Sequence, residues 1–284
     1  MSLESILILS DSPAWQARRW ASAWARLAAD VATRASASLV AWIFPLTVLL
    51  FWHLASTAHW VPEQVLPAPS TVWQTLSELL LSGELLGHLR ISAVRVLAGY
   101  AMGASVGLFL GVCIGLSPRF SAYVYPSFKA LSQVPVIGWL PLLMLLVGID
   151  EALKFLLIAK AALVPVVVNT AQGIQGVSNR FVEVARLYCF GRWQLLCKVV
   201  FPAATPQIWT GLRYGFTHAW LALVVVELLA SSEGVGFLIV YGRQLFQLDI
   251  VFCAVLVVGV LGFLIDKGLG LAEAHLLRWR RSGL

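Results

Sequence analysis

Long apolar runs separated by short polar segments dominate the chain from residue 39 onward. A helix that crosses a hydrocarbon core of about 30 Å needs about 20 consecutive apolar residues, whereas the strands of a membrane barrel alternate apolar and polar positions. The pattern predicts an all-α integral membrane protein with six transmembrane helices, the third of which is broken in its middle. The expected spans are residues 39–56, 92–116, 120–147, 152–177, 208–229 and 250–271.

Composition supports this class. Of 284 residues, 60% are hydrophobic and 12% are charged, and the mean hydropathy is +0.84. A soluble domain carries about 25% charged residues. The net charge of +6 is typical of cytoplasmic loops in a membrane protein, so we expect a lipid bilayer and no nucleic acid as a partner.

The positions of Lys and Arg predict the orientation, because cytoplasmic loops are enriched in both. These residues are concentrated before residue 35, in the turn 117–119, in residues 178–202 and after residue 266. Residues 53–88 contain neither, and the turn 148–151 is acidic. Both termini and the segment 178–202 are therefore expected in the cytoplasm, which agrees with an even number of spans.

Residues 1–37 are expected to form a cytoplasmic arm, and residues 38–284 the membrane domain. Four apolar residues of the arm recur at spacings typical of one helix face: Trp20, Trp24, Leu27 and Val31. A basic helix with such a face tends to lie in the membrane interface. A poorly ordered arm is the alternative.

The segment 178–202 is a polar, basic block between two apolar runs. The block predicts a short helix over residues 180–188, in which Glu183 near the N-terminus is favoured by the helix dipole. A second helix over residues 192–200 is expected to lead back to the membrane. Pro202 and Pro206 are then expected to restart the fifth span, because proline suits the beginning of a helix.

This block resembles the cytoplasmic "EAA" loop of permease subunits in ATP-driven (ABC) importers. The family pattern is Glu-Ala-Ala, three residues, Gly, nine residues and Ile-x-Leu-Pro. Glu183 and Ala185 match its start, and Pro202 matches its end at the right distance. The chain departs from the pattern at Cys189, where the family usually has Gly. We expect Gly191 to supply the flexibility of the turn instead.

Other segments resemble the sulfonate/taurine/nitrate branch of these permeases, and the likeness extends over residues 44–279. The segments that resemble this branch are residues 67–70, 82–85, 88–92, 107–115, 134–141, 148–151, 210–213 and 233–236.

The resemblance implies the MetI-like permease fold of type I importers. It also implies a second copy of the chain, two cytoplasmic ATPase subunits that use ATP and Mg, and an extracytoplasmic substrate-binding protein. The ATPase-coupling residues it implies are Arg180, Glu183, Ala185, Arg186, Tyr188, Cys189, Gly191 and Pro202. A solvated loop whose charge reflects orientation alone is the alternative interpretation of the block.

The third span is interrupted at residues 133–141, which contain two prolines and one glycine. Such residues kink or unwind a helix, and irregular backbone at membrane depth is tolerated where it is buried in protein or lines a wet cavity. The break is therefore a candidate gate, and Gln133, Pro135 and Trp139 are its candidate residues. A packing kink is the alternative.

Polar residues inside the fourth and fifth spans are further candidates for the translocation path, since they are costly in lipid and usually face a partner or a cavity. Asn169 lies in the fourth span, and Arg213, Thr217 and His218 lie in the fifth. Arg213 either attracts an anion or fixes a neighbouring helix, and His218 either lines the pore or bonds between helices. Glu227 is expected near the outer end, where Arg243 is its candidate partner.

Five glycines recur every fourth residue in the second span and predict a face for close helix packing: Gly99, Gly103, Gly107, Gly111 and Gly115. The four cysteines show no paired or metal-type spacing and are expected to be unpaired.

The sequence contains no G-x-x-x-x-G-K-[ST] motif and no catalytic signature. The chain is therefore expected to be a transport subunit rather than an enzyme, to bind no cofactor or metal, and to depend on a partner for ATP hydrolysis. An ion-coupled transporter and a membrane-embedded enzyme are the alternatives. The substrate stays open among sulfonates, taurine and nitrate.

Overall fold

A computed structural model describes residue 40 and residues 42–278. Every regular element in these residues is a helix, as predicted. The chain divides into two units, Met1–Pro69 and Ser70–Leu284, which are described separately. The predicted amphipathic arm and its boundary at residue 37 lie outside the described residues.

In the first unit, the apolar helix Trp42–Thr57 is shorter than the other candidate spans. The chain folds back after it. The indole N–H of Trp52 donates to the carbonyl of Pro67 at 3.0 Å, and the Ser56 hydroxyl donates to the carbonyl of Leu66 at 3.3 Å. These bonds hold the proline-rich segment against the end of the helix.

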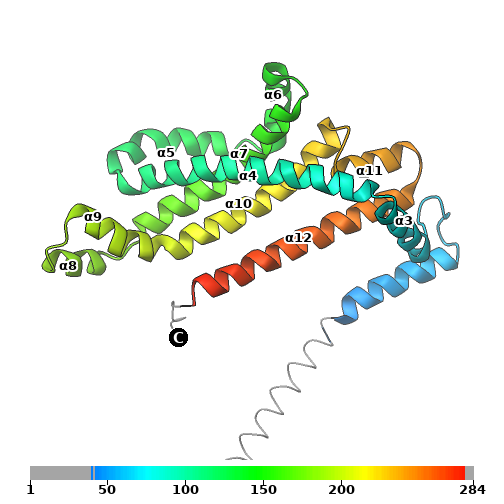
Figure 1. Cartoon of the computed structure of the whole chain (residues 1–284), viewed down its shortest axis with the longest axis horizontal. Coiled ribbons are helices and arrows are strands. Elements are labelled where there is room, and N and C mark those ends of the chain that lie inside the picture. Colours follow the sequence, from blue (N-terminus) through cyan, green and yellow to red (C-terminus); the bar gives the residue numbers. More distant parts are fainter. Residues whose placement is uncertain (1–39, 41, 279–284) are drawn as a thin grey trace, which may run out of the picture. The chain divides into compact units, whose positions relative to one another are not determined.

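The second unit is a series of helices and helical turns (Figure 1). In chain order they are α3 (Pro69–Leu81), α4 (Glu84–Leu116), α5 (Pro118–Ser132), η1 (Val136–Trp139), α6 (Leu140–Val147), α7 (Glu151–Gln175), α8 (Asn179–Leu187), α9 (Arg192–Leu195), η2 (Leu196–Val200), α10 (Phe201–Ala230), α11 (Val235–Gln244) and α12 (Leu248–Leu276).

Within the described residues, three helical stretches are long and apolar enough to cross a membrane: Glu84–Leu116, Arg192–Gln244 and Leu248–Leu276. A fourth crossing results if Pro118–Ser132 and Val136–Val147, which meet at 94°, form one broken span. The break in the third predicted span is thus confirmed. α7 coincides with the fourth predicted span, and the total of six stays a prediction.

The centre of the unit is the packing of α7 between α4 and α10, which make its most extensive contacts. The glycine stripe of α4 is the reason α7 comes so close. A Cβ added at Gly103 would lie 2.2 Å from the carbonyl oxygen of Ala159, and one at Gly111 would lie 2.6 Å from the Thr170 Cβ. The predicted packing role of these glycines is confirmed.

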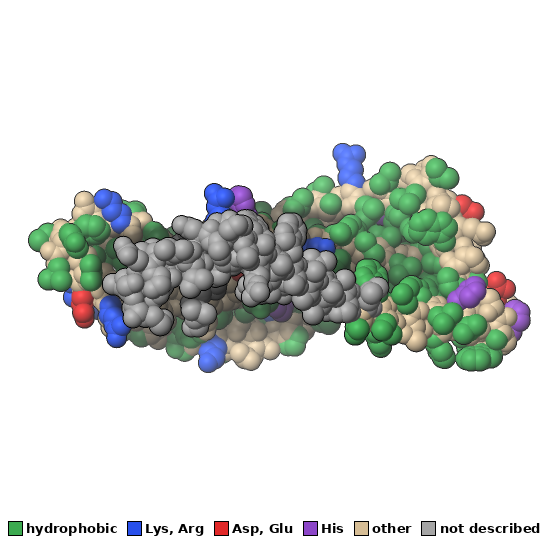
Figure 2. Space-filling model, turned by 90° about the horizontal axis from the view of Figure 1, so that it is seen from below, with side chains coloured by type: hydrophobic (Ala, Val, Ile, Leu, Met, Phe, Trp, Pro, Cys, Tyr) green, Lys and Arg blue, Asp and Glu red, His purple; other side chains and the backbone are tan. Residues whose placement is uncertain are grey.

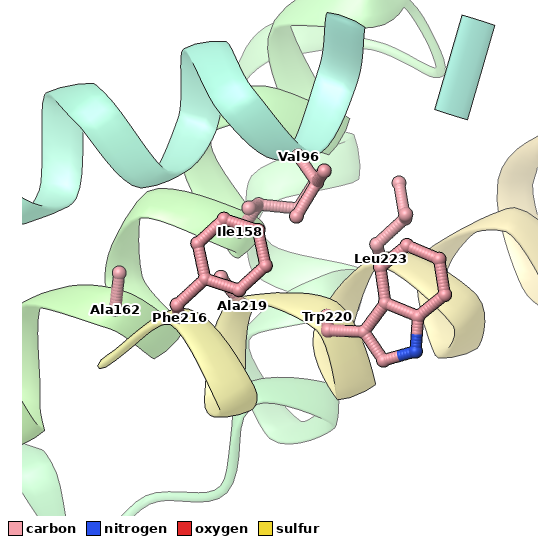
Figure 3. Close-up of a cluster of buried hydrophobic side chains, with 7 residues drawn as sticks. All are labelled: Val96, Ile158, Ala162, Phe216, Ala219, Trp220 and Leu223. Carbon is pink, nitrogen blue, oxygen red and sulfur yellow. The ribbon is translucent and has the colours of Figure 1, made fainter. Parts of the chain in front are cut away.

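A cluster of buried apolar side chains joins the same three helices (Figure 3). Val96 comes from α4, Ile158 and Ala162 from α7, and Phe216 and Leu223 from α10, together with two further residues of α10. All five are at most 9% exposed. Apolar burial therefore adds to the close backbone contact in fixing α7.

At the end of these helices opposite α8, an ionic network connects α4, α7 and α10; it is buried except at Glu151, whose side chain is 50% exposed. Arg95 donates to Glu227 at 2.9 Å and to Glu151 at 2.6 and 2.8 Å, and Lys154 donates to Glu151 at 2.6 Å. Glu227 is 1% exposed. The predicted pairing of Glu227 with Arg243 is wrong, because α4 brings Arg95 to Glu227 while Arg243 lies in the last turn of α11.

The turn between α10 and α11 closes over this network. The backbone N–H of Gly236 donates to the Glu227 carboxylate at 3.0 Å, and that of Val235 donates to the Ser92 hydroxyl at 3.0 Å. Gly234 has φ +111°, and a Cβ there would lie 2.2 Å from a Glu227 oxygen. The carboxylate thus requires glycine at this turn.

α10 begins without the break that the prolines predict. α9, η2 and α10 follow one another without interruption, and the junction residues Leu196, Val200 and Phe201 keep right-handed helical dihedral angles. Pro202 therefore lies inside a continuous helix, where it has no N–H to donate to the preceding turn. η2 is a π-helical turn directly before it, which accommodates the proline without ending the helix.

α3 is attached to the N-terminal end of α12. The Thr75 hydroxyl donates to Asp249 at 2.7 Å, and the buried Cys253 thiol donates to the carbonyl of Val72 at 3.0 Å. All four cysteines are free, as predicted.

Hydrophobic side chains are spread over much of the surface that the grey residues leave visible in Figure 2, and acidic side chains are few. Exposed residues on the long helices include Leu97 at 58%, Phe109 at 69% and Phe263 at 64%. Extensive exposed apolar surface of this kind marks contact with a membrane or with other proteins.

Candidate functional site

The polar block forms the helix α8 where the sequence predicts it, with a shift of one residue at each end. Ser178 caps its N-terminus, where its hydroxyl accepts a hydrogen bond from the backbone N–H of Arg180 at 3.4 Å. α8 connects to the end of α7 on one side and to α9 on the other. The block is therefore an ordered helical hairpin rather than an irregular loop.

The turn after α8 is sharp, and Cys189 makes it. Cys189 has φ +54°, the left-handed conformation that normally favours glycine. Its N–H donates to the carbonyl of Arg186 at 2.9 Å, and the N–H of Phe190 donates to that of Ala185 at 3.0 Å. These two bonds define a Schellman motif.

The expectation that Gly191 replaces the family's glycine is wrong. Gly191 has φ −66° and ψ 165°, an extended conformation open to any residue, and its N–H donates to the side chain of Gln194 at 3.1 Å. The Schellman bonds hold the turn at position 189 and impose the left-handed angle on cysteine.

One face of α8 is exposed although part of it is apolar. Arg180, Glu183, Val184 and Leu187 follow the i, i+3, i+4, i+7 spacing of a single face. Val184 is 52% exposed and Leu187 is 82% exposed. Among the described residues, no ion pair involves Arg180, Glu183 or Arg186. The sequence analysis missed the apolar half of this surface.

An adjoining face of α8, which includes Phe181 and Ala185, borders a cavity of 840 Å³ between the end of α7 and the start of α10; Val184 lies at the edge of both surfaces. Ala185, which is 4% exposed, contributes to its lining together with Gln172, Gly173, Tyr188, Pro202 and Gln207. Three of the eight predicted coupling residues therefore meet at this cavity, and the charged ones face away from it.

The candidate gate is an irregular segment between α5 and α6. α5 ends at Ser132, Pro135 precedes the 3₁₀ turn η1, and the chain changes direction by 94°. Trp139 packs in an apolar cluster with Leu153 and Val226, and its indole N–H has no hydrogen-bond partner among the described residues.

Lys160 of α7 is bound to this segment. Its ammonium group donates to the carbonyl of Val134 at 2.5 Å and lies 5.5 Å from the centre of the Trp139 ring. The sequence analysis overlooked Lys160. The rule that identified Asn169 and His218, an ionisable or polar residue within an apolar run, would have found it.

A second cavity, of 430 Å³, brings several of these residues together. Its lining includes Pro135 from the gate, Lys160 and Asn169 from α7, and His218 from α10. Gln133 and Trp139 of the gate are not in the lining; the Gln133 side chain donates instead to the carbonyl of Lys129 at 3.4 Å.

Arg213 and Thr217 do not belong to this cavity. Arg213 donates to Asp266 and Glu273 of α12, each at 3.0 Å. The Thr217 hydroxyl donates to the carbonyl of Arg213 at 3.2 Å. Of the two interpretations of Arg213, the structure therefore favours the one in which it fixes a neighbouring helix.

These features define a class: an all-helical protein with long apolar helices, a cavity with a few polar side chains in its lining and an exposed helical hairpin, as expected of a membrane transport subunit. Residues 103–276 match the family described as the binding-protein-dependent transport system inner membrane component. The chain belongs to this family of ABC transporter permeases. It is accordingly a multi-pass membrane protein and a permease subunit, not an enzyme.

Curated relatives make the comparison more specific. The chain is 42% identical over 240 residues to SsuC of Bacillus subtilis, named as an aliphatic sulfonates transport permease. The alignment covers 84% of this chain and 87% of that relative. It is 30% identical over 237 residues to TauC of Escherichia coli, named as a taurine transport system permease, with 82% and 86% covered.

A solved structure shows the same fold. It is an inward-facing conformation of the MetNI methionine ABC transporter, which aligns with a TM-score of 0.54 at 14% identity. The alignment covers 65% of this chain and 92% of that chain. The predicted MetI-like permease fold is confirmed.

Proposed function

We propose that this chain is the transmembrane subunit of an ATP-driven importer of small anions, with aliphatic sulfonates as the first candidates and taurine and nitrate as the others. Two copies form the pore in the bacterial plasma membrane, with both termini in the cytoplasm. Two separate ATPase subunits bind on the cytoplasmic side and use ATP and Mg, and a substrate-binding protein delivers the anion from outside.

The exposed face of α8 is the observation that carries the coupling role. Leu187 at 82% exposure and Val184 at 52% lie beside Glu183 on a helix that should face water. Exposed apolar groups rimmed by charged ones mark a protein-binding surface. A groove on the ATPase would cover the leucine and valine and pair with the charges of Arg180 and Glu183.

The mechanism proposed is alternating access. Closure of the ATPase dimer on ATP draws the two α8 helices together, and because α9, η2 and α10 are continuous, the displacement passes into α10. The pore then opens outward, and hydrolysis resets it. Binding of ATP shifts the population between two states by its different contacts in each.

Reconstitution in liposomes tests this function. The chain, its ATPase and its binding protein should import ethanesulfonate, taurine or nitrate when ATP is enclosed with the ATPase. Import without ATP, or import that is driven by an ion gradient and abolished by an ionophore, would instead favour an ion-coupled transporter.

Glu183→Lys tests the coupling surface. We expect the variant to reach the membrane normally but to lose at least tenfold in ATP hydrolysis stimulated by the loaded binding protein. Glu78→Lys, an exposed glutamate of α3, is the matched control and should keep wild-type hydrolysis. Normal stimulation in Glu183→Lys would refute the role of this face.

A further inference from the structure

Lys160 is a half-buried positive charge within α7. It lies nine residues after the start of α7, which is about 14 Å along a helix of about 38 Å at 1.5 Å per residue. Its neighbours Ala159 and Ala161 are buried. An ionisable residue at this depth is expected to serve a translocation path or to have a partner of opposite charge.

Among the residues that the structure describes, no carboxylate forms an ion pair with this lysine. The ion pairs of the described residues involve Arg95, Lys154 and Arg213, and none involves Lys160. Its one hydrogen bond in the described structure goes to the carbonyl of Val134. A carbonyl satisfies a donor but not a full positive charge, so the ammonium retains the capacity to attract an anion.

The surrounding cavity offers further polar groups of the right kind. The Asn169 amide nitrogen donates to the carbonyl of Pro165 at 2.9 Å, and its oxygen accepts from Gln207 at 2.8 Å, which leaves one amide hydrogen. His218 lines the cavity, and within the described part of the chain its ring takes part in no hydrogen bond.

We propose that Lys160 is the anion-binding residue of the translocation cavity, with Asn169 and His218 as secondary donors. The ligand class is a small monovalent oxyanion such as an alkanesulfonate, because an ammonium group with three donors matches a head group with several acceptor oxygens. A volume of 430 Å³ is within the range of small-molecule sites. This inference rests on the proposed import of anions.

The same ammonium group connects the anion to the gate. In this structure Lys160 holds the carbonyl of Val134, which belongs to the irregular segment before η1. With one of its three N–H groups on that carbonyl, the ammonium group has two left for an anion. A bound anion would therefore lie beside the gate segment.

Direct binding measurements test the proposal. The permease purified with its ATPase subunits, without the binding protein, is mixed with millimolar ethanesulfonate and examined by saturation-transfer-difference NMR. We expect a clear signal for ethanesulfonate and at least a fivefold weaker one for ethanesulfonamide, its neutral counterpart. Lys160→Met should remove the ethanesulfonate signal, and Lys160→Arg should keep it.

Two further variants separate binding from structure. Val164→Phe fills the cavity from the next turn of α7 while it leaves Lys160 intact, so it should also remove the signal even if Lys160→Met does not fold. Lys129→Met changes a lysine of α5 outside the cavity lining and should have no effect.

An unchanged signal in Lys160→Met or in Val164→Phe would overturn the proposal, and so would equal signals for the sulfonate and the sulfonamide. Failure of the proposed function is a separate result. In that case the wild-type complex does not import any of the anions with ATP, whatever the NMR signal shows.

Discussion

Glu227→Gln is the sharpest test of the ionic network between α4, α7 and α10. The glutamate is 1% exposed, and its carboxylate accepts hydrogen bonds from Ser92 at 2.8 Å, Arg95 at 2.9 Å and Gly236 at 3.0 Å. Glutamine has nearly the same size. It removes the charge, however, and places an NH₂ donor where one carboxylate oxygen had accepted.

The expected loss of stability depends on the ion pair that Arg95 retains in the variant. Removing one partner of a buried ion pair costs about 3–5 kcal/mol. Arg95 retains Glu151 on two of its nitrogens, at 2.6 and 2.8 Å, so we expect the lower end, about 3 kcal/mol. At about 2–4 °C per kcal/mol, the melting temperature should fall by about 6–12 °C.

Thermal unfolding of the detergent-solubilised protein, followed by circular dichroism, measures this shift. Asp266→Asn is the control, because it removes the same kind of charge from an ion pair whose carboxylate is 51% exposed. Exposed pairs contribute about 1 kcal/mol or less, so its melting temperature should change by at most about 4 °C. If Glu227→Gln lowered the melting temperature by no more than Asp266→Asn does, the network would not contribute to joining the three helices.

Two pairs of substitutions, one for backbone geometry and one for helix packing, use the same unfolding assay. Cys189→Gly should raise the free energy of unfolding by about 1 kcal/mol, because glycine tolerates the left-handed angle; Cys197→Gly, inside the π-helical turn, should lower it by a similar amount. Gly103→Ala should cost about 1–3 kcal/mol through overpacking against Ala159. Gly87→Ala, with open space around it, should be neutral or stabilising. A reversed order within either pair would contradict the geometry.

The sequence predicted the features that depend on local composition. Continuous apolar runs indicated helices in a membrane, and α4, α10 and α12 lie where they were expected. The glycine spacing of α4 indicated a packing face, and the two prolines of residues 133–141 indicated a break. Each of these follows from the steric or hydropathic properties of residues close together in the chain.

The predictions from the sequence were wrong where a residue's partner is distant in the chain, or where hydrogen bonds determine the backbone conformation. Glu227 was assigned to Arg243, sixteen positions away in the sequence, while the structure pairs it with Arg95 of α4. Cys189 was expected to avoid the sharp turn. The two hydrogen bonds of the Schellman motif outweigh the cost of its left-handed backbone angle. The preference of cysteine for particular backbone angles does not include the energy of these bonds.

The sequence by itself determined that this protein is a helical membrane permease with a cytoplasmic-type polar block, because hydropathy and motif spacing are properties of the chain. Only the tertiary structure decided which polar residues share a cavity. Pro135, Lys160 and His218 come from three separate segments and meet at one cavity because the glycines of α4 and the apolar cluster fix α7 beside α4 and α10. Such a meeting depends on helix packing, which is set by side chains far apart in the sequence.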